Sequence, residues 1–435
     1  MDFNSPRVPR RRWRMAFLLA FGVVIGFFDR INLAVSQQAL HTSFGISLIA
    51  FGYLSSAFSW TYAFMQMPAG MLLDRFGIRR VGRISTFLWS IACFAAAAAP
   101  GLGLFFGARF LLGIAEAPIF PANAKALGYW FPQQERSLAM AITDSAAKFS
   151  PAVGVPFLGL LLLHFGWRFA FAATGLLSLL YFVLFHVFYH NPREDSRLSP
   201  EEFQYIVDGG GQAENQFPAN SASLPGDLRR LTYLLRQPKV YGLALGWGAY
   251  NYSFYLLLTW LPTYLAIAHH MDILHSTFYT GAPFLFATVA DLVVGGWLVD
   301  FLIQRGWNPS RVRQSVLIGG TGFGLAIFGA VHPPSPTAAL CWISLALGGL
   351  AAAAPVAWTV PSLIAPRDSV ATLASIANFS SQLAAISAPI ITGYIVSATH
   401  SFGSAFVTAA VILAIGIASY AFLLGRITPI PEPAD

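Results

Sequence analysis

The stretch GMLLDRFGIRR, residues 70–80, is a short polar segment between two long apolar runs. One run lies near residues 47–72 and the other near 81–99, and about 20 apolar residues are enough to cross the hydrocarbon core of a bilayer. Its glycines allow close approach of the backbone, Asp74 can cap or pair at a helix end, and the arginines hold the segment at an aqueous face. The stretch therefore predicts a tight connection between two membrane-spanning helices.

Similar apolar runs fill most of the 435-residue chain, which is 56% hydrophobic and only 10% charged. Soluble domains average about 25% charged residues, so this composition excludes a soluble enzyme, and the mean hydropathy of +0.60 agrees. We expect an all-α membrane protein, not an enzyme, with twelve spans near residues 15–38, 47–72, 81–99, 101–123, 138–163, 167–189, 240–268, 276–303, 312–331, 337–361, 370–397 and 403–426.

The spans divide into two halves of six with a polar segment between them. The expected organisation is a basic N-terminus, an N-terminal half, a linker, a C-terminal half and a tail: 1–14, 15–190, 191–239, 240–426 and 427–435. The linker is expected to hold a short amphipathic helix at Pro200–Val207. Gly70 and Asp74 near the end of the second span are echoed by Gly296 and Asp300 near the end of the eighth, which indicates a duplicated transporter with its site between pseudo-symmetric halves.

The formal net charge of +7 reflects the placement of basic residues rather than a nucleic-acid partner. They gather in the N-terminus, the linker and alternate connections, and Arg426 ends the twelfth span; Arg168 is the clear exception. This positive-inside pattern predicts a multi-pass cell-membrane protein with both termini in the cytoplasm. The two cysteines, Cys93 and Cys341, lie within apolar runs, so no disulfide, metal site or cofactor is expected.

Residues 70–80 resemble the signature loop between helices two and three of the major facilitator superfamily. Within it, three further segments are similar to the anion:cation symporter family, which includes sugar-acid/proton symporters: Phe28–Arg30, Arg109–Pro118 and Trp130–Arg136. Residues 250–252 and 260–264 add to the resemblance, which covers nearly the whole chain outside the linker and the tails. It implies a conformational latch made by Gly70, Asp74, Arg75, Gly77 and Arg79.

Several ionisable residues lie within the predicted spans, where an ionised side chain costs at least about 2.5–3.5 kcal/mol. Arg109 and Glu116 are seven residues apart on one helical face, so each should face a neighbouring helix. We expect Asp29 and Glu116 to take up a proton during transport, since burial disfavours their charged forms and Arg109 favours them. The family resemblance supports this and implies that Arg30 binds the substrate carboxylate.

Lys148 is spaced i, i+4 from Asp144, and two interpretations stay open. The pair can be local, or Lys148 can enter the cavity as a second positive charge for a dicarboxylate. Asp291 is also inside a span and is left unassigned. Polar and aromatic residues at helical spacing complete the expected substrate site: Tyr62, Gln66, Tyr252, Tyr255, Trp358, Ser362, Asn378 and Gln382.

These observations predict a monomeric secondary transporter that carries an organic carboxylate, a sugar acid or dicarboxylate, together with protons by alternating access. An organic-phosphate/phosphate antiporter is the nearest alternative, but no Arg or Lys lies between Lys239 and Arg305 to supply its usual helix-seven cation. A substrate-sensing receptor on a transporter scaffold and a multidrug exporter are further alternatives. The expected partners are a small organic anion, protons and the lipid bilayer.

Overall fold

The computed structural model describes residues 9–211, 231–366 and 370–432, and within these ranges every regular element is helical. The first part contains α1 (Arg11–Val35), α2 (Gln37–Phe44), α3 (Leu48–Ala97), α4 (Leu102–Glu116), α5 (Ile119–Trp130), α6 (Gln133–Phe188) and α7 (Pro200–Asp208). The second contains α9 (Pro238–Ala268), α10 (Ile273–Ala290), the π-helix η1 (Asp291–Leu298), α11 (Val299–Gln304), α12 (Pro309–Gly324), the 3-10 helix η2 (Leu325–Ala330), α13 (Pro336–Ile364), α14 (Val370–Thr399), α15 (Phe402–Ala418) and the π-helix η3 (Ser419–Leu424).

Each of the twelve predicted spans coincides with helix over most of its length. Two long elements, α3 and α6, each hold two predicted spans, and each turns at a glycine with positive φ: Gly77 at 78° and Gly166 at 79°. Backbone of that geometry favours glycine, so Gly77 makes the connection predicted for residues 70–80. By length and apolar composition, seven helices of the described chain could each cross a membrane, or eight when α2 and the start of α3 count as one bent span.

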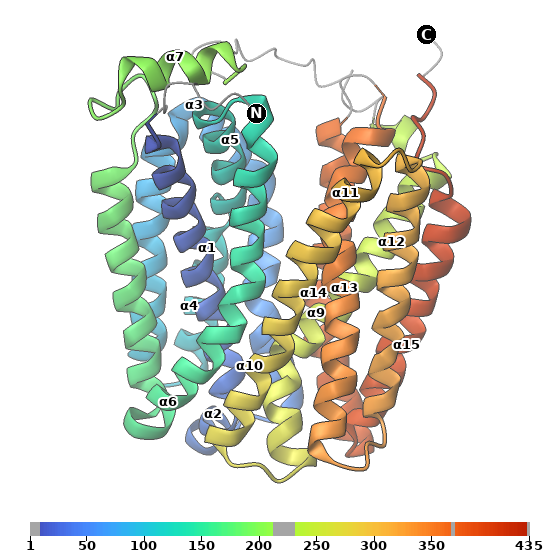
Figure 1. The fold of residues 1–435 in the computed structure, drawn as a ribbon. Helices are drawn as coiled ribbons and strands as arrows, with labels where there is room; N and C mark the ends of the chain where they lie inside the picture. The colour runs from blue at the N-terminus through green and yellow to red at the C-terminus, as the bar shows by residue number, and fades with distance from the viewer. Residues whose placement is uncertain (1–8, 212–230, 367–369, 433–435) are drawn as a thin grey trace.

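The elements form two bundles that lie side by side (Figure 1). α1 to α6 make the first, and α9 to η3 make the second, while α7 lies across the end of the first bundle. Both termini lie at that same end (Figure 1), which we call the terminal face. This is the expected all-α architecture of two six-helix halves, and it leaves a seam between the bundles where a solute can bind.

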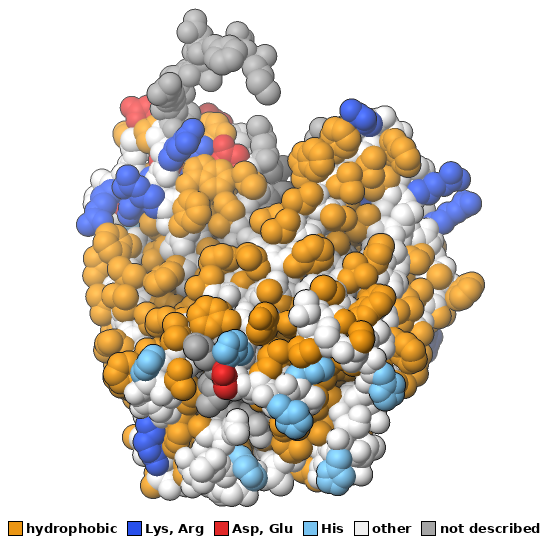
Figure 2. All heavy atoms as spheres, turned by 60° about the horizontal axis from the view of Figure 1, so that its bottom comes forward, with side chains coloured by type: hydrophobic (Ala, Val, Ile, Leu, Met, Phe, Trp, Pro, Cys, Tyr) orange, Lys and Arg blue, Asp and Glu red, His pale blue; other side chains and the backbone are white. Residues whose placement is uncertain are grey.

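The two halves approach each other most closely toward the face opposite the termini. A Cβ atom added at Gly52 of α3 would lie 2.6 Å from the carbonyl oxygen of Pro389 in α14. On the other side of the seam, one added at Gly281 of α10 would lie 2.7 Å from the carbonyl oxygen of Ala152 in α6. This face carries histidines and few charged side chains (Figure 2). The glycines therefore allow the halves to close at the end away from the termini.

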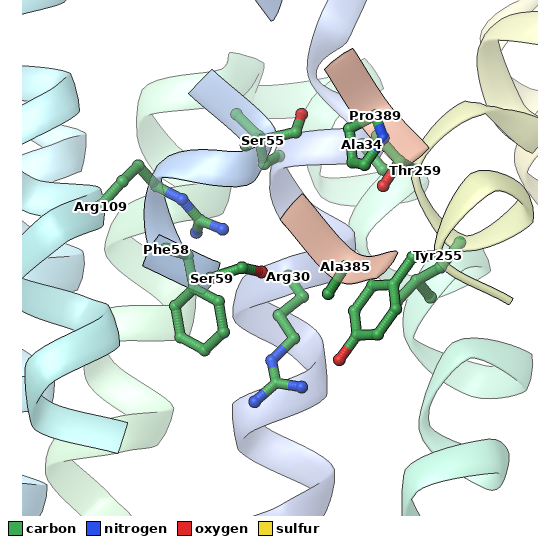
Figure 3. Close-up of a pocket in the computed structure, with 12 residues that line it drawn as sticks. Arg30, Ala34, Ser55, Phe58, Ser59, Arg109, Tyr255, Thr259, Ala385 and Pro389 are labelled. Carbon is green, nitrogen blue, oxygen red and sulfur yellow. The ribbon is translucent and has the colours of Figure 1, made fainter. Parts of the chain in front are cut away.

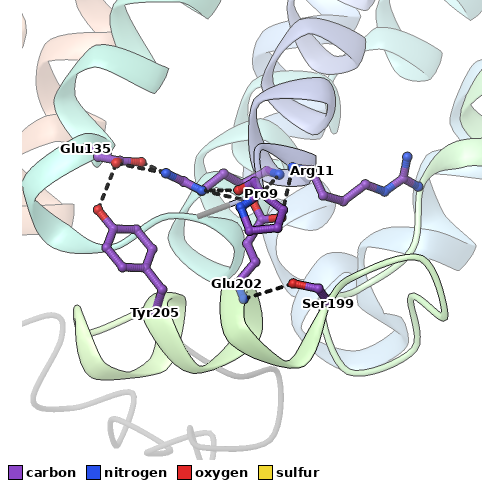
Figure 4. A network of polar contacts seen from close by, with 7 residues as sticks. Pro9, Arg11, Glu135, Ser199, Glu202 and Tyr205 are labelled. Atoms are coloured by element: carbon purple, nitrogen blue, oxygen red, sulfur yellow. Dashed lines mark hydrogen bonds and ion pairs between the residues drawn. The ribbon is translucent and has the colours of Figure 1, made fainter. Parts of the chain in front are cut away.

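A network of ion pairs ties the start of α1 to α6 and α7 at the terminal face (Figure 4). Arg12 contacts Glu135 at 2.7 Å and Glu202 at 3.0 Å, and Tyr205 donates a hydrogen bond to Glu135 at 2.9 Å. The hydrogen bond from Arg12 lowers the pKa of Glu135 below its ordinary value of 4.5. The predicted linker helix is thus confirmed as α7, and it begins with Ser199 as its N-cap.

Candidate functional site

A cavity lies in the seam between the two halves. α1 and α3 of the first half and α9 and α14 of the second supply most of its lining, with one residue from α4. Figure 3 shows the side chain of Arg30 extending between the rings of Phe58 and Tyr255. The lining residues are Arg30, Leu33, Ala34, Ser55, Phe58, Ser59, Arg109, Tyr255, Leu258, Thr259, Ala385 and Pro389.

Arg30 is the central charged group of this cavity. Its Nη2 donates a hydrogen bond to Oε2 of Glu116 at 3.0 Å, and the side chain of Glu116 is only 1% exposed. The guanidinium carbon lies 4.6 Å from the ring centroids of both Phe27 and Phe58, which favours a cation by its interaction with the rings. Nε of Arg30 is buried without a hydrogen-bond partner. The guanidinium is therefore held in place while part of its donor capacity stays unused.

The neighbouring carboxylate, Asp29, points away from the cavity into the first half. Its Oδ2 accepts a hydrogen bond from Nε1 of Trp89 at 2.5 Å, and its Oδ1 accepts one from Sγ of Cys93 at 3.2 Å. Ser178 of α6 also donates to Oδ2 at 3.5 Å. Adjacent residues on a helix point about 100° apart, so α1 presents Arg30 to the seam and Asp29 to the interior of its own half.

Arg109 and Glu116 of α4 both contact α1 rather than each other. Nη1 of Arg109 donates to the backbone oxygen of Asp29 at 3.1 Å, while Glu116 pairs with Arg30. Oε1 of Glu116 and Nε of Arg109 are buried without a hydrogen-bond partner. A second, smaller cavity joins Arg30 and Glu116 and runs between α1 and the start of α5. The structure thus brings the three predicted coupling residues, Asp29, Arg109 and Glu116, and the predicted substrate-binding Arg30 around one stretch of α1.

Lys148 of α6 is bound by two carboxylates from different halves. Its Nζ lies 2.5 Å from Oδ2 of Asp144, four residues away on the same helix, and 2.9 Å from Oδ2 of Asp291 at the start of η1. The side chains of Lys148 and Asp291 are 5% and 4% exposed, whereas that of Asp144 is 32% exposed. The local pair and a contact across the seam therefore exist together.

The other residues expected at the substrate site take different positions. Tyr255 lines the cavity, and Tyr62 stacks on Phe58 within 5.6 Å of the Arg30 guanidinium. Nδ2 of Asn378 donates to Oε1 of Gln66 at 2.5 Å, which joins the halves on the α3–α14 side of the seam. Tyr252 and Gln382 are buried in the second half, Trp358 packs edge-on against Trp247, and the side chain of Ser362 lies outside the described residues.

The expected latch residues lie around the turn in α3. Arg79 forms an ion pair with Glu194 of the linker at 2.9 Å, and Arg75 lies over the ring of Phe76. A Cβ added at Gly70 would meet nothing within 4 Å, so this part of α3 is not packed against the second half in this conformation. The side chain of Asp74 lies outside the described part of the structure.

Three hydroxyl groups of the cavity were absent from the predicted site: Ser55, Ser59 and Thr259. Oγ of Ser55 is buried without a hydrogen-bond partner. The spacing of these residues was a usable signal, because Ser55 and Ser59 precede Tyr62 and Gln66 at steps of four, three and four residues. Such steps place all four on one face of a helix, and Thr259 follows Tyr255 in the same way.

The charge of the cavity is asymmetric. Its cations, Arg30 and Arg109, both come from the first half, while α9 and α14 line it with Tyr255, Thr259 and apolar residues. Among the described residues, no group of three or more His, Cys, Asp or Glu is arranged to hold a metal ion. The arrangement offers fixed positive charge on one side and hydroxyl groups on both sides, which suits a small hydroxylated anion.

The chain is similar to known transporters along nearly its whole length. The family model of the Major Facilitator Superfamily matches residues 17–388. An uncharacterized transporter of Bacillus subtilis (strain 168) is 36% identical over 417 residues, covering 96% of this chain and 94% of the relative. A D-galactonate transporter of Escherichia coli O6:H1 is 32% identical over 428 residues, covering 98% of each chain.

A probable galactarate/D-glucarate transporter of Escherichia coli (strain K12) is 31% identical over 425 residues, covering 96% of this chain and 95% of the relative. Among solved structures, a bacterial homolog of the human lysosomal transporter Spinster, in an inward-facing and unoccupied conformation, has a TM-score of 0.74. It is 18% identical and covers 97% of this chain and 98% of its own. This last similarity concerns the fold alone.

Proposed function

The chain belongs to the Major Facilitator Superfamily, and from that membership we propose that it is a proton-coupled symporter of a sugar-acid anion. It is a multi-pass membrane transporter and not an enzyme. Relatives that cover almost all of the chain are named as transporters of D-galactonate and of galactarate or D-glucarate. These are polyhydroxylated carboxylates, which is the chemistry that the cavity fits.

One observation carries the proposal: unpartnered polar atoms converge on the cavity at Arg30. Nε of Arg30, Nε of Arg109 and Oγ of Ser55 are buried without hydrogen-bond partners, and all three residues line the cavity. A buried polar group without a partner costs about 1–3 kcal/mol, so such a cluster marks a place for a ligand. A carboxylate bound at Arg30 satisfies the guanidinium, and the hydroxyls of Tyr255 and Thr259 are placed for the polyol chain.

Coupling to protons follows from the contact between Arg30 and Glu116. A substrate carboxylate and Glu116 compete for the same guanidinium, which lies 3.0 Å from Glu116 in the structure. When the substrate takes Arg30, Glu116 becomes a buried carboxylate without its main partner, and protonation removes that cost. Asp29 accepts a hydrogen bond from Trp89 of α3. Protonation of Asp29 weakens this bond and so changes how α1 is held against α3. Arg109 donates to the backbone oxygen of Asp29 and interacts electrostatically with both carboxylates.

We propose alternating access because the two halves touch each other near one end of the molecule. The close approaches at Gly52 and Gly281 lie toward the face away from the termini, and the basic residues of the chain gather at the terminal face. The positive-inside rule assigns the terminal face to the cytoplasm. We infer that the structure is an inward-facing state in which the outer ends of α3, α6, α10 and α14 are closed, and that rocking of the halves opens them.

The substrate class can be identified by ligand-dependent thermal stability of the purified protein. A panel of carboxylic acids, including D-galactonate, galactarate and gluconate, is screened at pH 5.5 and pH 7.5, with the corresponding neutral polyols as matched controls. A sugar acid at 100 times its Kd stabilises the fold by about 2.7 kcal/mol, and we expect the larger shift at pH 5.5. Stabilisation by the polyols alone, or by phosphate esters rather than carboxylates, overturns the proposal.

A further inference from the structure

The contact between Lys148 of α6 and Asp291 of η1 joins the two halves on one side of the seam. Going along α6 and α10 from the face away from the termini, Gly159 faces Thr277, then Ala152 faces Gly281, and finally Lys148 faces Asp291. The first two approaches are so close that an added Cβ would lie 2.4 Å and 2.7 Å from the facing atoms. The ion pair therefore lies on the side of this tightly packed zone that is toward the terminal face.

The charges at this contact do not balance. One ammonium, on Lys148, faces two carboxylates, on Asp144 and Asp291. Asp144 is 32% exposed, so water can hydrate it, but Asp291 is 4% exposed and depends on Lys148 for its counter-charge. The attraction of an ion pair weakens as nitrogen and oxygen move apart and water enters between them. If the helices separate here, Asp291 must bind another cation or become neutral.

Asp291 also begins an irregular stretch of backbone. It is the first residue of η1, a π-helix of eight residues that continues α10. π-Helical segments inside α-helices are rare and often occur at functional sites. Gly295 within η1 packs so closely on α13 that an added Cβ would lie 2.6 Å from the carbonyl oxygen of Ala352. The position of Asp291 against α6 is thus set by a special backbone conformation supported by α13.

We propose that Asp291 is a second proton-binding site, located in the C-terminal half, from which Lys148 displaces the proton as the halves close. This rests on the proposed proton symport and its inward-facing assignment. In the outward-facing state, opening of the α6–α10 zone separates the pair, Asp291 takes a proton from external water, and Lys148 keeps Asp144. On closure the ammonium of Lys148 returns to Asp291, and the proton leaves toward the terminal face, where Asp144 is partly hydrated.

The ionisable surroundings of Asp291 are few. Among the described groups, those that interact electrostatically with it are Lys148, Asp144 and Tyr250 of α9. η1 packs against α6, α10, α11 and α13. α13 has no charged residue, α11 has Asp300, and α10 has only His275, Tyr279 and no Lys, Arg, Asp or Glu. Lys148 is therefore the cation that sets whether Asp291 holds a proton.

The test is the number of protons moved per substrate, measured in proteoliposomes at zero membrane voltage. At zero net flux, the ratio of the inside to the outside concentration of radiolabelled D-galactonate depends on the number of protons carried with it. This ratio rises about tenfold for each co-transported proton and each unit of pH gradient. The double variant K148M/D291N removes both charges, so no unpaired ion stays buried. We expect it to accumulate about tenfold less D-galactonate than wild type at a gradient of one pH unit.

Asp272→Asn is the matched control, because it removes an exposed carboxylate at the start of α10 that pairs with His275, and it should keep the wild-type ratio. Should the double variant not fold, Lys148→Met alone tests the same claim, since Asp291 then keeps its proton in both states and the ratio falls equally. A wild-type ratio in K148M/D291N or in K148M overturns the inference and leaves the proposed function intact. If the wild-type protein shows no response to the pH gradient, the proposed function fails and the inference with it.

Discussion

The guanidinium of Arg30 and the carboxylate of Glu116 lie 3.0 Å apart although 86 positions separate them along the chain. Both line the smaller cavity between α1 and the start of α5, and Arg30 also lines the cavity at the seam of the two halves. Because a bound carboxylate and Glu116 need the same donor, occupancy of the cavity and protonation of Glu116 are expected to depend on each other. This pair is the core of the proposed mechanism.

Arg30→Lys tests whether the planar guanidinium is required. An ammonium keeps the charge but cannot offer two parallel donors to a carboxylate, and loss of a buried charged contact costs about 2–5 kcal/mol. We expect R30K to weaken binding of D-galactonate by at least about 30-fold, as measured by isothermal titration calorimetry. Arg14→Lys, on the exposed surface of α1, is the control and should bind as wild type. Equal affinities in the two variants contradict the assignment of Arg30.

Lys148→Met separates a role in substrate binding from a role in proton exchange. If Lys148 binds the second carboxylate of galactarate after it has separated from Asp291, replacing Lys148 removes a contact that D-galactonate does not make. We expect the variant to lower initial uptake of galactarate at least about tenfold more than that of D-galactonate. Equal losses for the dianion and the monoanion exclude Lys148 from the substrate site.

Gly52→Ala tests where the halves close. The new Cβ would lie 2.6 Å from the carbonyl oxygen of Pro389, and overpacking of this kind costs about 1–3 kcal/mol. We expect the population to shift toward the outward-facing state, seen as longer distances between spin labels at Thr42 and His275 in pulsed electron resonance. Gly107→Ala is the control, because nothing lies within 4 Å of its added Cβ. Unchanged distances in G52A refute the closure at this point.

The network at the terminal face predicts a dependence on pH. Arg12 lowers the pKa of Glu135 below 4.5, so the contact stabilises the fold above the unfolded pKa and this contribution is lost as pH falls through the lower, folded pKa. Glu135→Gln should therefore reduce stability by about 1 kcal/mol at pH 7, and the difference should shrink as the pH falls and vanish once the pH is below the lowered, folded-state pKa of Glu135. Thermal unfolding followed by intrinsic fluorescence measures both. A difference that does not shrink as the pH falls below 4.5 is inconsistent with an ionic contribution.

The architecture was largely predictable because each span corresponds to a local apolar run of residues. The turn at Gly77 was predictable as well, since its glycine and flanking arginines are adjacent in the chain. Arg30 was placed at the site from a resemblance, and the helical angle between neighbours accounts for Asp29 pointing in a different direction. Local signals were sufficient for these features.

Contacts between distant segments could not be predicted in the same way. The partner of Lys148 in the second half, Asp291, depends on how α6 and α10 align across the seam, and no local pattern encodes that register. The π-helix that positions Asp291 likewise depends on packing against α13. Ser55 and Ser59 were missed for another reason. Their helical spacing was visible, but a neutral serine in an apolar span does not by itself indicate a ligand site.

The most direct test of the central claim compares two activities of Glu116→Gln and Asp29→Asn in proteoliposomes. A neutral carboxamide cannot release a proton, so these variants should still exchange labelled for unlabelled D-galactonate across the membrane. They should, however, accumulate less D-galactonate than the wild-type protein in response to the same pH gradient. Wild-type accumulation in both variants contradicts proton coupling through Asp29 and Glu116.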